Sequence, residues 1–170
     1  MNNKLCKLLG VRYPIIQAAM AYISWSDLAA AVSNAGGLGT IGPNPGPGFR
    51  QEVSDVSQAG ELLRTEIRRT KTLTNKPFAV NFAIGRGRQA PFTDRCVEVG
   101  IEERIPVAIV TMGSPDIYTE RLKKAGCVVL HAVGSVKHAT NAERAGVDGV
   151  ICEGYEGGGH LGGEELPTFV

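Results

Sequence analysis

One glycine-rich segment contains the residues with the clearest potential for chemistry. It runs from Glu153 to His160 as Glu-Gly-Tyr-Glu-Gly-Gly-Gly-His and directly follows an apolar run. Consecutive glycines let backbone N–H groups approach a flat or anionic ligand closely. An imidazole titrates near neutral pH, so His160 is a candidate for proton transfer. From composition alone, a surface loop with an incidental histidine explains the same residues equally well.

Asn81 is a second candidate, because it interrupts the apolar run Phe78–Phe82 near its carboxyl end. An amide at this place either hydrogen-bonds a ligand or is satisfied by the backbone of a neighbouring strand, and both uses remain open. His131 also stands at the end of an apolar run, where a structural role is favoured over a catalytic one. His138 falls on a helical pattern and is interpreted as a solvated residue.

The segment Gly37–Gly42 matches the dinucleotide-binding pattern G-x-G-x-x-G, but its context is wrong. That fingerprint must follow a strand and open a helix. Here the glycines follow a helical pattern and enter an apolar run. We therefore interpret them as a helix end and a tight entry into a strand, and not as a nucleotide site.

Short apolar runs alternate with helical patterns along the whole chain, and these elements must position the candidates. The runs are mostly continuously apolar, as expected of parallel strands buried on both faces. The predicted strands are Tyr13–Gln17, Leu38–Ile41, Phe78–Phe82, Val107–Thr111, Cys127–His131 and Gly149–Cys152. Five helices are predicted between them: from a Ser24 or Ser26 cap to Gly36, over Gln58–Lys71, over Thr93–Glu103, from a Ser114 cap, and from a Ser135 cap to Gly146.

This order predicts an α/β fold with a parallel sheet. Two architectures fit: a doubly wound open sheet and a (β/α)8 TIM barrel. The length of 170 residues favours the open sheet, since barrels typically take about 250 residues. However, glycine-rich or polar residues follow nearly every predicted strand, as barrel active sites require, and a further apolar element begins near Leu166. We therefore predict a TIM barrel of which residues 1–170 supply the first six strands and five helices.

Composition argues against several function classes. The chain has 18 Lys+Arg and 17 Asp+Glu, which gives no electrostatic case for binding nucleic acid or an anionic membrane. Its apolar runs are far shorter than a membrane span, and the amino terminus lacks the apolar run of a signal peptide, so we predict a cytoplasmic protein. The four cysteines form no C-x-x-C pair; we expect reduced thiols and no metal site.

Four ordered motifs resemble the nitronate monooxygenase family, formerly called 2-nitropropane dioxygenases. They are Pro14–Met20, Ala35–Gly39, Lys76–Asn81 and Gly157–His160. Flavin-dependent enoyl-acyl carrier protein reductases are close relatives of this family. The resemblance covers essentially the whole chain and implies the N-terminal two-thirds of one FMN-binding TIM-barrel domain.

The same resemblance implies roles for individual residues. The FMN contacts it implies are Met20, with the backbone of Gln17–Met20, and then Asn81, Glu153, Gly157 and Gly158; His160 matches the active-site histidine. The chain departs from the family pattern at two of its positions. Many relatives have Gln where Glu153 stands and Pro or Gly where Ala19 stands. A carboxylate near the flavin would raise the cost of an anionic reduced flavin.

The activity implied by the resemblance is the FMN-dependent oxidation of alkyl nitronates or nitroalkanes by O2, which gives a carbonyl compound and nitrite. The implied partners are a small-molecule substrate and O2, and a homo-oligomer is left open. One alternative is an NAD(P)H-dependent flavin enoyl reductase on the same scaffold. Another is a non-catalytic part of a barrel that needs a partner.

Overall fold

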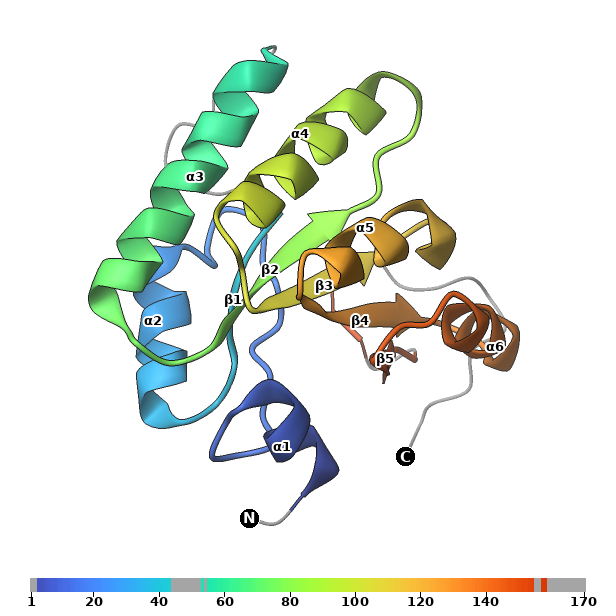
Figure 1. Ribbon diagram of the computed structural model, residues 1–170, viewed down its shortest axis with the longest axis horizontal. Helices are drawn as coiled ribbons and strands as arrows, with labels where there is room; N and C mark the ends of the chain where they lie inside the picture. Colours follow the sequence, from blue (N-terminus) through green and yellow to red (C-terminus); the bar gives the residue numbers. More distant parts are fainter. Residues whose placement is uncertain (1–2, 44–52, 54, 155–156, 159–170) are drawn as a thin grey trace.

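The computed structural model of this chain describes residues 3–43, 53, 55–154 and 157–158. A parallel five-stranded sheet in the order β1-β2-β3-β4-β5 runs through it (Figure 1). The strands are β1 (Gly39–Ile41), β2 (Phe78–Ala83), β3 (Val107–Thr111), β4 (Val128–Val133) and β5 (Gly149–Cys152). The helices are α1 (Lys4–Leu9), α2 (Ser26–Ala35), α3 (Val56–Leu73), α4 (Ala90–Glu102), α5 (Thr119–Lys124) and α6 (Val136–Arg144), with short 3-10 turns η2 (Gly87–Gln89) and η3 (Pro115–Ile117).

Every strand pairs in parallel with the strand that precedes it in the chain. A doubly wound sheet reverses its strand order at a switch point, and the described part of this sheet contains no such reversal. The strands instead follow one another in sequence order, as they do in the wall of a β/α barrel. The sheet topology therefore decides between the two architectures in favour of the barrel.

The two faces of the sheet have separate apolar cores. On one face, Phe78, Val80 and Phe82 of β2 pack with Leu63 and Ile67 of α3. On the other face, the core joins α1 to the sheet and consists of Leu9, Leu38, Ala79, Val107, Ile109 and Leu130. Continuous burial along β2 and β3 confirms the prediction of parallel strands covered on both faces. We call these the helix-covered face and the inner face.

Helix α2 lies closer to β1 than any side chain on Gly39 would allow. A Cβ atom at Gly39 would stand 1.8 Å from the backbone oxygen of Ala29. Helix α2 ends at Gly36, whose φ of 103° lies in the left-handed region that glycine adopts readily. Within the G-x-G-x-x-G pattern, Gly37 follows this cap and donates its N–H to the Val32 carbonyl oxygen of α2, while Gly39 allows the close packing, which confirms their interpretation from sequence.

The first predicted strand forms only in part. Within Tyr13–Gln17, a single parallel bridge joins Ile16 to Leu38. The next rung of the ladder uses the side chain of Gln17 in place of its backbone, because Thr40 N–H donates to Oε1 of Gln17. The prediction of six strands is therefore corrected to five strands and one bridge within the described residues.

The predicted helices are found, with corrections at their ends, and α1 was not predicted. Neither Ser24 nor Ser26 caps α2: Trp25 is the N-cap residue, and its side chain makes no capping hydrogen bond. The carboxylate of Glu66 on α3 accepts from Ser26 N–H at 2.9 Å instead. The region after Ser114 divides into η3 and α5, and only the Ser135 cap forms as predicted, accepting from His138 N–H.

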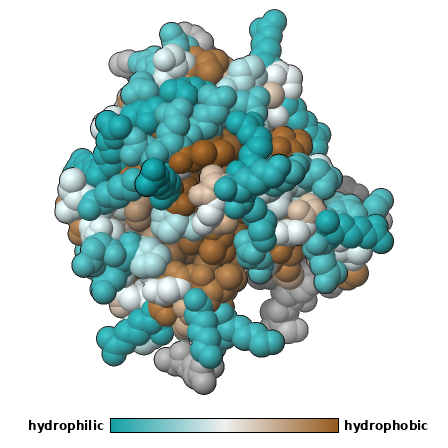
Figure 2. All heavy atoms as spheres, in the orientation of Figure 1, coloured by the Kyte–Doolittle hydropathy of each residue, from teal (hydrophilic) through white to brown (hydrophobic). Residues whose placement is uncertain are grey.

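Hydrophilic residues dominate the surface over α3 and α4 on the helix-covered side (Figure 2). Ion pairs join these two helices, with Arg64 of α3 bonded to Glu103 at 3.0 Å and Arg95 of α4 to Glu61 at 3.7 Å. Among the described residues, no helix is both long enough and apolar enough to cross a membrane.

The contact at Gly39 leads to a stability prediction. We expect Gly39→Ala to lower the free energy of unfolding by more than about 3 kcal/mol, because the added methyl group would overlap backbone and not a movable side chain. Gly60→Ala is the matched control, since its Cβ would meet only side-chain atoms, of Arg95 and Val99; a smaller loss than at Gly39 is expected there. Equal stability of the two variants in urea unfolding would contradict this account of α2–β1 packing.

Candidate functional site at the carboxyl edge of the sheet

The carboxyl ends of the five parallel strands meet at one edge of the sheet, and the predicted site residues gather there. Asn81 lies in β2, and Glu153 directly follows β5. Met20 is brought to this edge by its contact with Gly42, the residue after β1: a Cβ on Gly42 would stand 2.8 Å from the Met20 carbonyl oxygen. Active sites of β/α barrels lie at this edge.

Asn81 is 5 % exposed and lies on the inner face, in register with Ile109. Its Nδ2 donates to the Ile109 carbonyl oxygen at 3.2 Å and to Oγ1 of Thr111 at 3.3 Å. Within the described residues its Oδ1 accepts no hydrogen bond. The amide can therefore serve both purposes that the sequence left open. Its Nδ2 bonds the neighbouring strand, and its Oδ1 is left for a ligand.

Glu153 and Gly157 lie against each other at the end of β5. The Glu153 N–H donates to the Val133 carbonyl oxygen at 3.0 Å, which extends the ladder between β4 and β5. A Cβ on Gly157 would stand 2.8 Å from both Cγ and Oε1 of Glu153. A side chain at Gly157 would therefore displace the Glu153 side chain, whereas a Cβ on Gly158 would meet no atom of the described residues within 4 Å.

Of the two candidate histidines, only His131 is among the described residues. His160 lies outside the described residues, so its role stays a prediction. His131 is buried and in register with Val110 of the helix-covered core, away from the inner face that carries Asn81. Its Nδ1 has no hydrogen-bond partner among the described residues. Burial lowers the pKa of His131, opposed by a contact with the Gly113 backbone. These features agree with the structural role favoured from sequence.

Sequence reasoning missed the polar groups that hold the Met20 segment in place. The Ser24 hydroxyl accepts from Met20 N–H at 3.0 Å and from Nε2 of Gln17 at 2.8 Å. The glutamine that ends an otherwise apolar run, Pro14–Gln17, was the available signal. Next to this cluster, the buried Thr40 hydroxyl has no partner within the described residues. Its position opposite Ala79 places it on the inner face.

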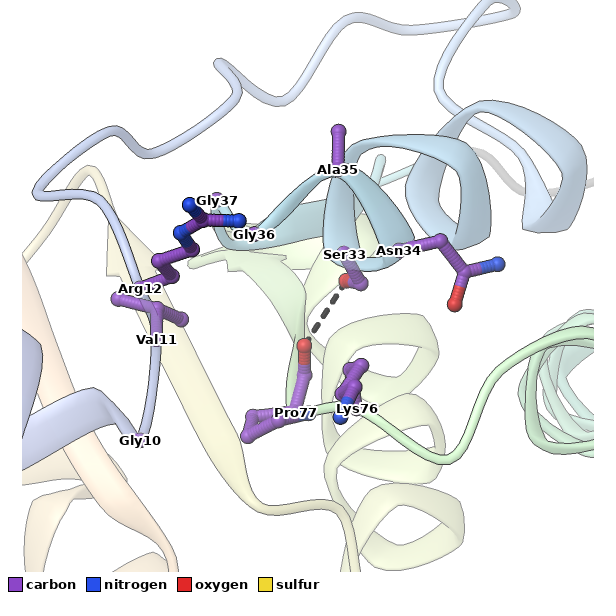
Figure 3. Close-up of a pocket in the computed structure, with 10 residues that line it drawn as sticks. All are labelled: Gly10, Val11, Arg12, Ser33, Asn34, Ala35, Gly36, Gly37, Lys76 and Pro77. Atoms are coloured by element: carbon purple, nitrogen blue, oxygen red, sulfur yellow. Dashed lines mark hydrogen bonds between the residues drawn. The ribbon is translucent and has the colours of Figure 1, made fainter.

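A cavity of about 290 Å³ lies at the opposite, amino-terminal edge of the sheet (Figure 3). The end of α2, the residues before β2 and the segment after α1 line it. Beside it, the Ser33 hydroxyl donates to the Pro77 carbonyl oxygen at 2.8 Å. Because this cavity lies away from Asn81 and Glu153, we do not assign it to the candidate site. The described residues also contain no cluster of three His, Cys, Asp or Glu side chains that would hold a metal ion.

Residues 2–169 match the family model described as nitronate monooxygenase. The chain belongs to the nitronate monooxygenase family. A nitronate monooxygenase from Paraburkholderia phytofirmans is 34 % identical over 95 % of this chain and 50 % of its own length. The (3aS,4S,5R,7aS)-5-hydroxy-7a-methyl-1-oxo-octahydro-1H-indene-4-carboxyl-CoA dehydrogenase of Mycobacterium tuberculosis is 33 % identical over 95 % of this chain and 41 % of its own length.

Solved structures agree with this family assignment. FabK from Thermotoga maritima superposes with a TM-score of 0.84 at 38 % identity, over 100 % of this chain and 49 % of FabK. A nitroalkane oxidase from Streptomyces ansochromogenes superposes with a TM-score of 0.77 at 28 % identity, over 93 % of this chain and 50 % of the oxidase. These neighbours are TIM barrels, so the predicted fold class is confirmed. The chain spans about half the length of the family members it matches.

The environment of His131 leads to a pH prediction. Because its pKa is lowered in the folded protein, unfolding takes up a proton, and stability falls as pH drops from the unfolded pKa of about 6.5 through the folded pKa. Each pH unit between these values costs up to about 1.4 kcal/mol. Urea unfolding from pH 8 to pH 5 should show this loss in the wild type and a smaller loss in His131→Leu. His138→Gln is the comparison: charge on the exposed His138 also lowers the pKa of His131, so this variant should reduce the slope less than His131→Leu does.

Proposed function

We propose that this protein is an FMN-dependent oxidoreductase that oxidises alkyl nitronates, with O2 as the electron acceptor and a carbonyl compound and nitrite as products. The observation that carries the proposal is the match to the nitronate monooxygenase family over residues 2–169. It is supported by the gathering of Met20, Asn81 and Glu153 at the edge where barrel enzymes place their active sites.

The residues at this edge fit a flavin. A flavin is a flat ring with polar edges, and the inner face offers it the acceptor oxygen of Asn81, which accepts no hydrogen bond within the described residues. Gly157 and Gly158 allow close backbone approach at the end of β5, since a Cβ on Gly158 would meet no atom of the described residues. When bound, FMN supplies the electron transfer. The residues proposed to hold it are Met20, Asn81, Glu153, Gly157 and Gly158.

The protein contributes positioning and proton transfer. A nitronate is already an anion, so its oxidation needs no base. A neutral nitroalkane must first lose its α-proton, and we assign this step to the imidazole of His160, whose unperturbed pKa of about 6.5 suits a base at neutral pH. The carboxylate of Glu153, held against Gly157, disfavours additional negative charge in the site.

A second candidate function is flavin-dependent redox chemistry on an acyl thioester. The similarity to FabK and to a carboxyl-CoA dehydrogenase supports it. So do large apolar side chains exposed on loops at the carboxyl edge: Tyr22, Ile23, Met112 and Ile117. Tyr22 and Met112 have φ values of 66° and 64°, which are unfavourable for bulky residues and common at functional sites. Bleaching of the flavin by NADH without nitronate would favour this candidate, and bleaching by nitronate alone would favour the first.

The acceptor oxygen of Asn81 gives a test of the cofactor assignment. Asn81→Leu should weaken FMN binding by about 1–3 kcal/mol, the usual cost of losing such a partner. Thr111→Val is the matched control, because it removes one partner of Nδ2 and leaves Oδ1 in place. Titration of the flavin-free protein with FMN, followed by fluorescence, measures both affinities. Equal losses in the two variants would show that Asn81 acts only through the sheet.

The base assignment predicts a difference between two substrate forms. His160→Asn should largely abolish turnover of neutral nitroalkanes, because a positioned base typically contributes about 10²–10⁴-fold to proton abstraction. Nitronate turnover should stay within about tenfold of the wild type. Steady-state assays with both forms, at saturating FMN, measure this difference. Equal losses on the two substrates would remove the base assignment.

A further inference from the structure

The side chain of Gln17 continues the sheet where its backbone stops. In a parallel ladder, the rung after the Ile16–Leu38 bridge would join the backbone of residues 17–19 to Thr40. The primary amide of Gln17 takes that place. Its Oε1 accepts from Thr40 N–H at 3.2 Å, and its Nε2 donates to the Thr40 carbonyl oxygen at 3.0 Å. An amide side chain carries one acceptor and two donors, so it satisfies both backbone groups of Thr40.

The second donor of Gln17 fixes the loop that follows. Nε2 also lies 2.8 Å from the Ser24 hydroxyl, and that hydroxyl accepts from Met20 N–H at 3.0 Å. The Ser24 carbonyl oxygen in turn accepts from Gly42 N–H at 2.8 Å, directly after β1. One amide and one hydroxyl therefore connect the carboxyl end of β1 to the backbone of Met20.

This substitution releases the backbone of the next residues from the sheet. In an uninterrupted ladder, Ala19 N–H would donate to the Thr40 carbonyl oxygen. With Gln17 in that place, the N–H groups of Ala18 and Ala19 make no hydrogen bond within the described residues. They lie in the segment that ends at Met20, at the carboxyl edge of the sheet.

We propose that Gln17 is a positioning residue for the flavin: its amide replaces one rung of the sheet, and so turns the Ala18–Met20 backbone toward the cofactor instead of toward β1. This inference rests on the proposed flavin binding. It does not depend on whether a nitronate or an acyl thioester is the substrate.

Gln17→Leu tests the proposal, because leucine retains similar bulk but cannot bond Thr40 or Ser24. FMN affinity of the full chain should fall by about tenfold or more, the equivalent of at least one lost hydrogen bond. The visible absorption band of bound FMN should shift, since the groups around the flavin change. A variant that only loosens the fold would not shift the band of the flavin that remains bound.

Ser33→Ala is the matched control. Its hydroxyl bonds the amino-terminal end of the same strand, accepting from Gly39 N–H at 3.1 Å and donating to the Pro77 carbonyl oxygen at 2.8 Å (Figure 3). The serine is buried, as is the Thr40 rung. Both variants should lower the melting temperature of the flavin-free protein, but Ser33→Ala should leave the FMN affinity and spectrum unchanged.

Gln17→Glu adds a pH readout. A carboxylate lacks the donor that the Thr40 carbonyl oxygen and Ser24 need, whereas a protonated carboxyl donates again. FMN affinity of this variant should therefore recover as pH falls, relative to the wild type at each pH. If Gln17→Leu fails to fold, Ser24→Ala, which removes only the hydroxyl next to Met20, should show the same spectral shift with a smaller loss of affinity.

Wild-type affinity and spectrum in both Gln17→Leu and Ser24→Ala would overturn the inference, as would an equal flavin effect in Ser33→Ala. Failure of the wild-type chain to bind FMN would instead overturn the proposed function. The two failures are thus separated by the wild-type titration alone.

Discussion

Helix α2 and strand β1 touch through backbone, and the candidate site depends on that contact. At Gly39 the space between them is too small for a methyl group. Because α2 is packed against β1, the position of its first residue, Ser26, is fixed, and Ser24 lies two residues before it. Because Gly42 N–H donates to the Ser24 carbonyl oxygen, the carboxyl end of β1 and the loop that carries Met20 are held by the same short segment. Movement of α2 would move that loop.

The start of α2 is stabilised from outside its own sequence. Helices usually begin with a side chain that accepts a backbone N–H, but Trp25 cannot do this. Glu66, 5 % exposed on α3, supplies the acceptor for Ser26 N–H. A carboxylate at a helix N-terminus also interacts favourably with the helix dipole. The exposed pair between Asp27 and Arg69 adds a second link between the same helices, so α3 helps set the position of the Met20 loop.

The names of two relatives state different substrates, a nitronate and a carboxyl-CoA compound. The nitronate monooxygenase, the carboxyl-CoA dehydrogenase and FabK are each at least 33 % identical to this chain, and each match covers at least 95 % of it. A flavin accepts electrons from chemically different donors, and the protein selects among them by shape, charge and proton transfer. Under the function proposed above, those choices would fall to the exposed apolar residues Tyr22 and Met112 and to His160.

The sequence by itself determined the element types, the parallel sheet and the candidate residues. Short, mostly apolar runs such as Phe78–Phe82 favour strands buried on both faces, and a histidine or amide at a strand end is visible without a structure. The glycine pattern at Gly37–Gly42 could also be interpreted correctly, because the element order around it excludes a nucleotide site.

Only the tertiary structure decided how hydrogen bonds are shared between distant residues. The sequence predicted a strand over Tyr13–Gln17 from its apolar run, but the side chain of Gln17 and not its backbone bonds Thr40. Ser24 looked like a helix cap, yet it binds Met20, while Glu66 serves α2 from α3. Asn81 donates to the neighbouring strand, while its Oδ1 accepts no hydrogen bond within the described residues. Local patterns show which groups need partners, whereas the choice of partner depends on which segments the fold brings within hydrogen-bonding distance.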